Sequence, residues 1–161
     1  MKIKPLDSKL FFLFIFIISA CSLSFALYVE NVLGYLPCNL CIYQRWPYLA
    51  MGLLSLAGLF VKHTRLIIAA IIIATLASII LSFWHAGVEL HIFDSSSTCS
   101  NQIKIPQNLS FEETIKLLDN APVATCSAVA FKIFNTSMSQ INFLASIMLL
   151  IFSIIIYRRI S

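Results

Sequence analysis

The chain has 161 residues, of which 60% are hydrophobic and only 11% are charged, with a formal net charge of +4 and a mean hydropathy of +0.92. Soluble globular domains are about 45–50% apolar and about 25% charged, so the composition excludes a soluble domain and indicates an integral membrane protein. The small numbers of glycine and proline also exclude a collagen-like or disordered chain.

Four stretches approach the ~20 apolar residues that a helix needs to cross the hydrocarbon core. They predict spans over residues 10–29, 42–61, 66–84 and 141–157. The second stretch begins with Arg45-Trp46-Pro47, where proline is tolerated in the first turns and the arginine can still reach the membrane interface. We therefore expect an all-α membrane protein, folded as a single four-helix transmembrane domain over residues 1–161.

Basic residues gather in the two tails and in the short loop between the second and third spans. Seven of the 11 Lys and Arg residues lie there: Lys2, Lys4, Lys9, Lys62, Arg65, Arg158 and Arg159. The positive-inside rule predicts that these segments are cytoplasmic, which leaves residues 30–41 and 85–140 as outer loops. The basic balance then reflects topology in the lipid bilayer rather than binding to nucleic acid.

The long outer loop contains a helix signal. Ser110 to Glu113 form a capping box, which predicts a short amphipathic helix from there to about Asp119. Such a helix outside the membrane is expected to lie along the bilayer surface.

Five cysteines divide into one within the membrane and four on the outer side. Cys21 lies in the first span, and the sequence Ile18 to Cys21 is similar to a lipoprotein signal; the apolar run continues to Val29, which favours a span and an inert thiol. The outer four are Cys38, Cys41, Cys99 and Cys126. An even set in an oxidising compartment indicates disulfide chemistry.

The outer cysteines are of two kinds. Cys38 and Cys41 form a CxxC at the start of the second span, whereas Cys99 and Cys126 flank the predicted amphipathic helix and meet only if the loop closes. A helix N-terminus and a nearby cation lower the pKa of a thiol, and Arg45 lies one turn after Cys41. Arg45 is therefore expected to stabilise either a thiolate or an anionic electron acceptor.

Two histidines are further candidates for functional residues. His85 is expected at the outer end of the third span, at the depth where a quinone head group could be met, while His91 is expected to be an interfacial anchor. A zinc site needs two further ligands beside the CxxC, and no second CxxC or HxxxH exists, so no metal ligand is assigned.

Two alternative functions stay open: a metal-binding or transport protein that uses the CxxC, and a bundle whose cysteines form purely structural bridges.

The segment Pro37 to Arg45 (PCNLCIYQR) resembles the signature of the disulfide bond formation protein B (DsbB) family. His85 to Glu89, Pro122 to Cys126 and Ser137-Met138 are also similar to that family. The likeness covers nearly the whole chain. It implies a thiol:quinone oxidoreductase of the bacterial inner membrane, with periplasmic cysteines, that reoxidises a thioredoxin-fold, DsbA-like thiol oxidase.

The resemblance also implies a role for each site residue. Cys99 and Cys126 would form the loop disulfide, with Cys99 attacked by the partner. Cys38 and Cys41 would form the disulfide next to the membrane, and Cys41 would meet ubiquinone or menaquinone from the membrane pool. Arg45 would hold the quinone oxygen, assisted by His85.

Overall fold

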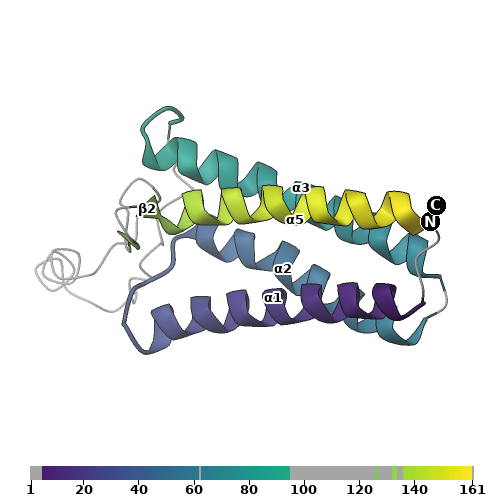
Figure 1. Ribbon diagram of the computed structural model, residues 1–161. Coiled ribbons are helices and arrows are strands. Elements are labelled where there is room, and N and C mark those ends of the chain that lie inside the picture. The colour runs from purple at the N-terminus through teal and green to yellow at the C-terminus, as the bar shows by residue number, and fades with distance from the viewer. Residues whose placement is uncertain (1–4, 62, 95–125, 127–131, 134–135, 161) are drawn as a thin grey trace, which may run out of the picture.

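Four long helices form an elongated bundle in the computed structural model (Figure 1), which describes residues 5–61, 63–94, 126, 132–133 and 136–160. The helices are α1 (Pro5–Asn31), α2 (Asn39–Phe60), α3 (Thr64–Glu89) and α5 (Met138–Ile160). The two ends of the chain lie at the same end of the bundle, and the loop between α1 and α2 lies at the opposite end. The predicted all-helical architecture is confirmed for the described residues, apart from one very short strand pair.

That strand pair was not predicted. β1 (Lys132–Ile133) pairs antiparallel with β2 (Thr136–Ser137), with Lys132 opposite Ser137. β2 runs directly into α5, so the pair fixes the point at which the chain re-enters the bundle. The predicted amphipathic helix, from Ser110 to about Asp119, lies outside the described residues.

Three of the helices are long and apolar enough to cross a membrane: the segments Ser8–Asn31, Thr64–Glu89 and Met138–Ile160. α2 falls short of the same measure, because its first turns contain Gln44, Arg45 and two aromatic residues around Pro47. The composition and these three helices identify a membrane protein.

The helices extend beyond the predicted spans. α3 continues to Glu89 rather than ending at 84, and α5 begins at Met138 rather than at 141. The prediction that a loop starts at residue 85 is wrong, because Ala86, Val88 and Glu89 continue the helix until the chain turns. His85 therefore sits inside a regular helix, which fixes the direction of its side chain.

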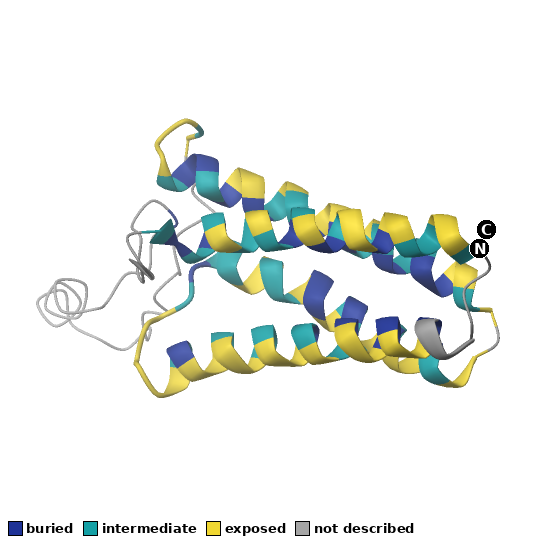
Figure 2. Cartoon of the chain, in the orientation of Figure 1, coloured by how far each residue is buried: buried dark blue, intermediate teal, exposed yellow. Residues whose placement is uncertain are grey.

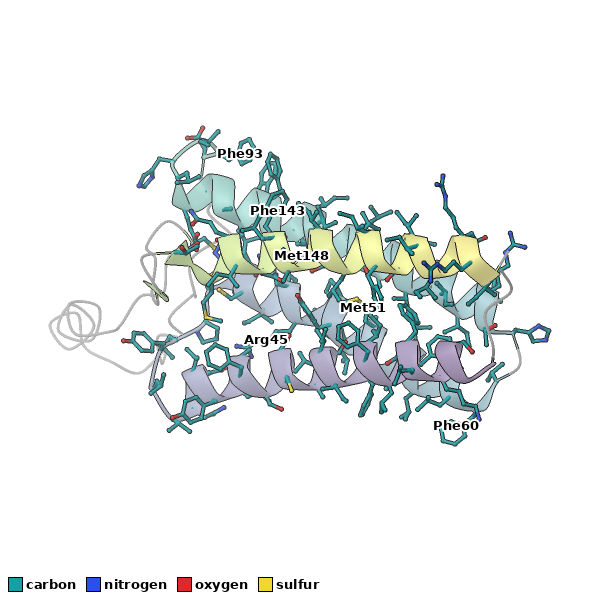
Figure 3. The ribbon with its side chains drawn as sticks, viewed as in Figure 1. Arg45, Met51, Phe60, Phe93, Phe143 and Met148 are labelled. Carbon is teal, nitrogen blue, oxygen red and sulfur yellow. The ribbon has the colours of Figure 1, made fainter. Side chains whose placement is uncertain are left out.

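The outer surface of the bundle is apolar. α1 packs on α2, α2 on α3, and α3 on α5, and large apolar side chains such as those of Ile73 and Met148 are exposed. Exposed positions, drawn in yellow, recur along all four helices in Figure 2. Phe60 points away from the bundle (Figure 3) and is 82% exposed. An apolar core that includes Phe12, Met51 and Ile71 lies between the helices. Hydroxyl groups are buried with it, and they include Ser55, Thr75, Ser78, Ser82, Ser146 and Ser153.

Hydrogen bonds between helices use these buried groups. The hydroxyls of Ser78 in α3 and Ser146 in α5 are 2.9 Å apart, and the Tyr48 hydroxyl of α2 donates to Oδ1 of Asn142 in α5 at 2.6 Å. Small and hydroxylated residues are typical of helix contacts within membranes. The hydrophobic effect does not drive helices together in lipid, so close packing and hydrogen bonds do so instead.

We expect Gly58→Ala to destabilise the bundle by about 1–3 kcal/mol, because overpacking forces neighbours to shift. A Cβ at Gly58 would lie 2.6 Å from the ring of Phe12, which is fully buried. Gly52→Ala is the matched control: its Cβ would meet Ser19 at an ordinary 3.5 Å, so it should be neutral or stabilising. Unfolding of both variants in mixed detergent measures the difference, and equal stabilities would contradict the close α1–α2 packing.

Candidate active site

The CxxC lies at the N-terminus of α2, and its first cysteine caps the helix. Cys38 has extended backbone angles, and its Sγ accepts a hydrogen bond from the Cys41 backbone N–H at 3.4 Å. The Cys38 thiol also donates to Sγ of Cys41, with the two sulfurs 3.0 Å apart. The pair is therefore present as two thiols in contact, so that closing a disulfide requires only a small approach of the sulfurs.

The environment makes the two thiols unequal. Its hydrogen bond to Cys41, together with burial, raises the pKa of Cys38 to about 12. Accepting that hydrogen bond lowers the pKa of Cys41, against the opposing effect of burial. A hydrogen bond to the charged form favours it, so Cys41 ionises more readily than Cys38. Because the thiolate is the nucleophile, we expect Cys41 to be the more reactive of the two sulfurs.

We expect the alkylation rate of Cys41 in the reduced protein to rise with pH through a midpoint below that of an ordinary thiol, because Cys38 donates a hydrogen bond to the Cys41 sulfur and lowers its pKa. Below that midpoint the thiolate is protonated and the rate falls, whereas Cys38 stays unreactive throughout. Cys38→Ala removes the donor and should move the midpoint to higher pH. Iodoacetamide labelling read by peptide mass spectrometry, with a chelator present, measures this; a midpoint above that of an ordinary thiol, or faster labelling of Cys38, would contradict the assignment.

α3 contributes a histidine and a carboxylate to the same place. His85 is buried, and its Nε2 lies 3.6 Å from Sγ of Cys38 and 3.6 Å from Oε1 of Glu89, one turn later. The Ser139 hydroxyl at the start of α5 donates to Oε2 of Glu89. The hydrogen bond between Ser139 and Glu89 thus links α5 to α3 beside the CxxC.

The turn after α3 closes one side of this site. His91 has a positive φ of 56°, and the N–H groups of Ile92 and Phe93 bond back to the Gly87 carbonyl. The Phe93 ring then stacks on Trp84, with centroids 4.9 Å apart, so closely over Gly87 that a Cβ there would collide with it. His91 is exposed and serves the turn rather than the site.

Arg45 has an ionic partner that sequence reasoning missed. Its Nη1 lies 2.7 Å from Oε2 of Glu30 at the end of α1, and Figure 3 shows Arg45 between α1 and α2. Glu30 belongs to no motif, although it lies near the C-terminal end of α1 and Arg45 lies near the N-terminal end of α2. The contact that favours the Cys41 thiolate comes from Cys38, while the guanidinium group is held by Glu30.

Cys126 joins the site from a distant part of the chain. Its side chain is 1% exposed and lies in one apolar cluster with Cys38 and Val88, against which Cys41 and Phe93 pack. Three of the four predicted redox cysteines are therefore together; the fourth, Cys99, lies outside the described residues. Cys21 is an exposed free thiol on α1, away from this cluster.

Comparison with known proteins identifies the family to which the chain belongs. The family model described as disulfide bond formation protein DsbB matches residues 8–156. The chain belongs to the DsbB family. It is 29% identical to disulfide bond formation protein B 1 of Pseudomonas aeruginosa over 96% of this chain and 98% of that protein. It is also 39% identical to an uncharacterized protein of Rickettsia prowazekii, over 84% of this chain and 79% of that one.

Membership of the DsbB family makes the chain a membrane oxidoreductase of disulfide bond formation. The cluster of Cys38, Cys41 and Cys126 is the part of the structure suited to that chemistry. Glu30, Glu89 and Ser139 are the site neighbours that motif reading did not assign. A charge at the end of a span, and a carboxylate one turn after a membrane histidine, were the available signals for the first two.

Proposed function

We propose that this DsbB-family protein is a thiol:quinone oxidoreductase that reoxidises a periplasmic, DsbA-like dithiol oxidase and passes the electrons to membrane quinone. The observation that carries the proposal is the packing of Cys126, from the long loop, against the CxxC of α2. A soluble partner cannot reach a quinone dissolved in lipid, so a second cysteine pair must connect the partner to the membrane edge.

The thiol steps follow from disulfide exchange. A partner thiolate attacks the Cys99–Cys126 disulfide at Cys99, which forms a mixed disulfide and releases Cys126 as a thiolate. Cys126 then attacks the Cys38–Cys41 disulfide at Cys38 and releases Cys41. The partner's second thiol resolves the mixed disulfide and releases Cys99, which attacks Cys126 and displaces Cys38, so that the Cys99–Cys126 disulfide forms again. Each exchange breaks one S–S bond and forms another, so two electrons move from the partner to the CxxC.

The order within the CxxC follows from the two pKa values. Cys41 is the better leaving group, because the lower pKa thiol leaves faster and its pKa is depressed by the hydrogen bond from Cys38. Attack by Cys126 is therefore directed to Cys38, and Cys41 is released as the thiolate. This leaves the reactive sulfur on the helix that also carries Arg45.

Ubiquinone or menaquinone fits the residues around Cys41. Nδ1 of His85 is buried and has no hydrogen-bond partner among the described residues, so a protonated Nδ1 would donate to a quinone carbonyl. Arg45, held by Glu30, would supply a second donor with positive charge. When bound, the quinone accepts the two electrons and two protons that leave when the Cys38–Cys41 disulfide forms again. Burial of Cys38 and His85 keeps water away from that step.

The proposed topology places this site on the periplasmic side of the bacterial inner membrane. α2 is the fourth span in this arrangement, with both termini and the loop containing Arg65 in the cytoplasm. The positive-inside distribution of Lys and Arg supports it, and so does the location of both termini at the end of the bundle opposite the α1–α2 loop.

Acid-quenched thiol trapping in cells tests the function. With a mass-tagged maleimide, only Cys21 should be labelled in growing cells, and further cysteines should become labelled when quinone synthesis is blocked. In Cys38→Ser the same cysteines should be labelled with and without quinone depletion. A labelling pattern of the wild-type protein that ignores quinone depletion would mean structural bridges or bound metal instead of a relay.

A further inference from the structure

The reduced site has the geometry of a metal-ligand set. Nitrogen or sulfur atoms of Cys38, Cys41 and His85 all lie within 4.8 Å of one another. The individual separations are 3.0 Å between the two sulfurs and 3.6 Å between Sγ of Cys38 and Nε2 of His85. Cys38 and His85 are 5% and 3% exposed, which makes this a built site rather than a surface cluster.

The ligand types and spacing match zinc. Zn–S bonds of about 2.3 Å and Zn–N bonds of about 2.0–2.1 Å place the ligand atoms of a tetrahedral site about 3.3–3.8 Å apart. The Cys38–His85 separation already has this value, and the two sulfurs need to separate by less than about 1 Å. Three protein ligands leave a fourth position for water, with the Glu89 carboxylate 3.6 Å from His85 beside it.

We propose that the reduced Cys38–Cys41 pair and His85 form a zinc site, and that zinc bound there holds the enzyme in its reduced, inactive form. Formation of the two Zn–S bonds displaces the remaining thiol protons to solvent, and no electron is transferred. The disulfide form offers no thiolate and loses two of the three ligands. Zinc binding and reoxidation of the CxxC are therefore mutually exclusive. Zinc would inhibit the enzyme only after the CxxC has been reduced during a turnover.

Zinc titration of the full-length protein in detergent micelles tests this without partner or quinone. In the Cys21→Ser, Cys99→Ser, Cys126→Ser background only Cys38 and Cys41 are left as thiols. After phosphine reduction, competition with a chromophoric chelator should give one Zn²⁺ per chain, and the same protein with the Cys38–Cys41 disulfide should bind at least tenfold less tightly. Co²⁺ in place of Zn²⁺ should give the absorption bands of a tetrahedral thiolate site.

Two histidine variants separate a built site from a bare CxxC. His85→Asn should weaken zinc binding by about tenfold or more, because one ligand is lost. His91→Asn is the matched control and should bind as the parent does, since His91 is exposed and asparagine tolerates its positive φ. Circular dichroism checks the folding of each variant, and Cys41→Ser provides a second ligand loss if His85→Asn unfolds.

Three results would overturn the zinc site: no binding to the reduced protein, equal binding to the disulfide form, or equal affinity in folded His85→Asn. None of them would affect the proposed relay, because that is read from quinone-dependent thiol labelling. Conversely, zinc binding with the expected redox and His85 dependence would stand even if the electron acceptor proved not to be a quinone.

Discussion

Cys41→Ser is expected to lower the rate of quinone reduction by about 10³-fold or more, because loss of a covalent catalytic group removes the pathway rather than weakening it. Serine cannot close a disulfide with Cys38, and it offers no thiolate nucleophile. Purified protein in detergent, supplied with a reduced thioredoxin-fold oxidase and ubiquinone, gives the rate from the loss of quinone absorbance.

Cys21→Ser is the control for this variant. Cys21 is an exposed thiol on α1 and does not belong to the apolar cluster that contains Cys38, Cys41 and Cys126. The rate of quinone reduction by the Cys21→Ser protein should equal that of the wild-type protein. A Cys41→Ser protein that retains a tenth of the rate, or a folded Cys21→Ser protein without activity, would show that the reactive cysteine has been assigned wrongly.

Arg45→Ala is expected to raise the KM for quinone by about 10–100-fold, because a hydrogen bond to a charged donor contributes about 1.5–3 kcal/mol. The Arg45 side chain is 23% exposed and its guanidinium is ion-paired with Glu30, so the substitution also leaves the Glu30 carboxylate without this partner. Steady-state kinetics over a range of quinone concentrations separates KM from kcat.

Glu30→Gln distinguishes quinone binding from a structural ion pair. If Arg45 binds the quinone oxygen, the glutamine variant keeps the cation and frees it, and the KM should stay the same or fall. If the Arg45–Glu30 pair only ties α1 to α2, then both substitutions break it and both should have the same effect. Equal increases in KM would therefore contradict a direct role for Arg45 at the quinone.

The sequence predicted the helices and the position of the CxxC with good accuracy. Apolar runs of span length predict the four helices, and the CxxC was expected where the second span begins, at residue 42. In the structure α2 begins three residues earlier, at Asn39, and Cys38 caps it. The ends were less predictable: hydropathy stops at Trp84, but helical hydrogen bonding continues for five more residues to Glu89. The apolar run indicates which residues lie in the hydrocarbon core, but a helix can continue beyond the edge of that core.

Contacts between distant residues were beyond sequence reasoning. The Glu30–Arg45 ion pair and the Ser139–Glu89 hydrogen bond each join two helices, and no local pattern records which faces meet. The unequal acidities of Cys38 and Cys41 depend on a thiol rotamer and on burial, so a motif could suggest reactivity but not which sulfur carries the charge. Burial of Cys126 beside them likewise depends on the path of the loop.

The most direct test of the relay is the stoichiometry of a single anaerobic turnover. Wild-type protein, an excess of quinone and a limiting amount of reduced DsbA-like partner are mixed, and quinol and partner thiols are quantified together. A relay that ends in quinone predicts one quinol formed for each partner dithiol oxidised, and none in Cys41→Ser. Oxidation of the partner without quinol, or quinol formation that persists in Cys41→Ser, would contradict it.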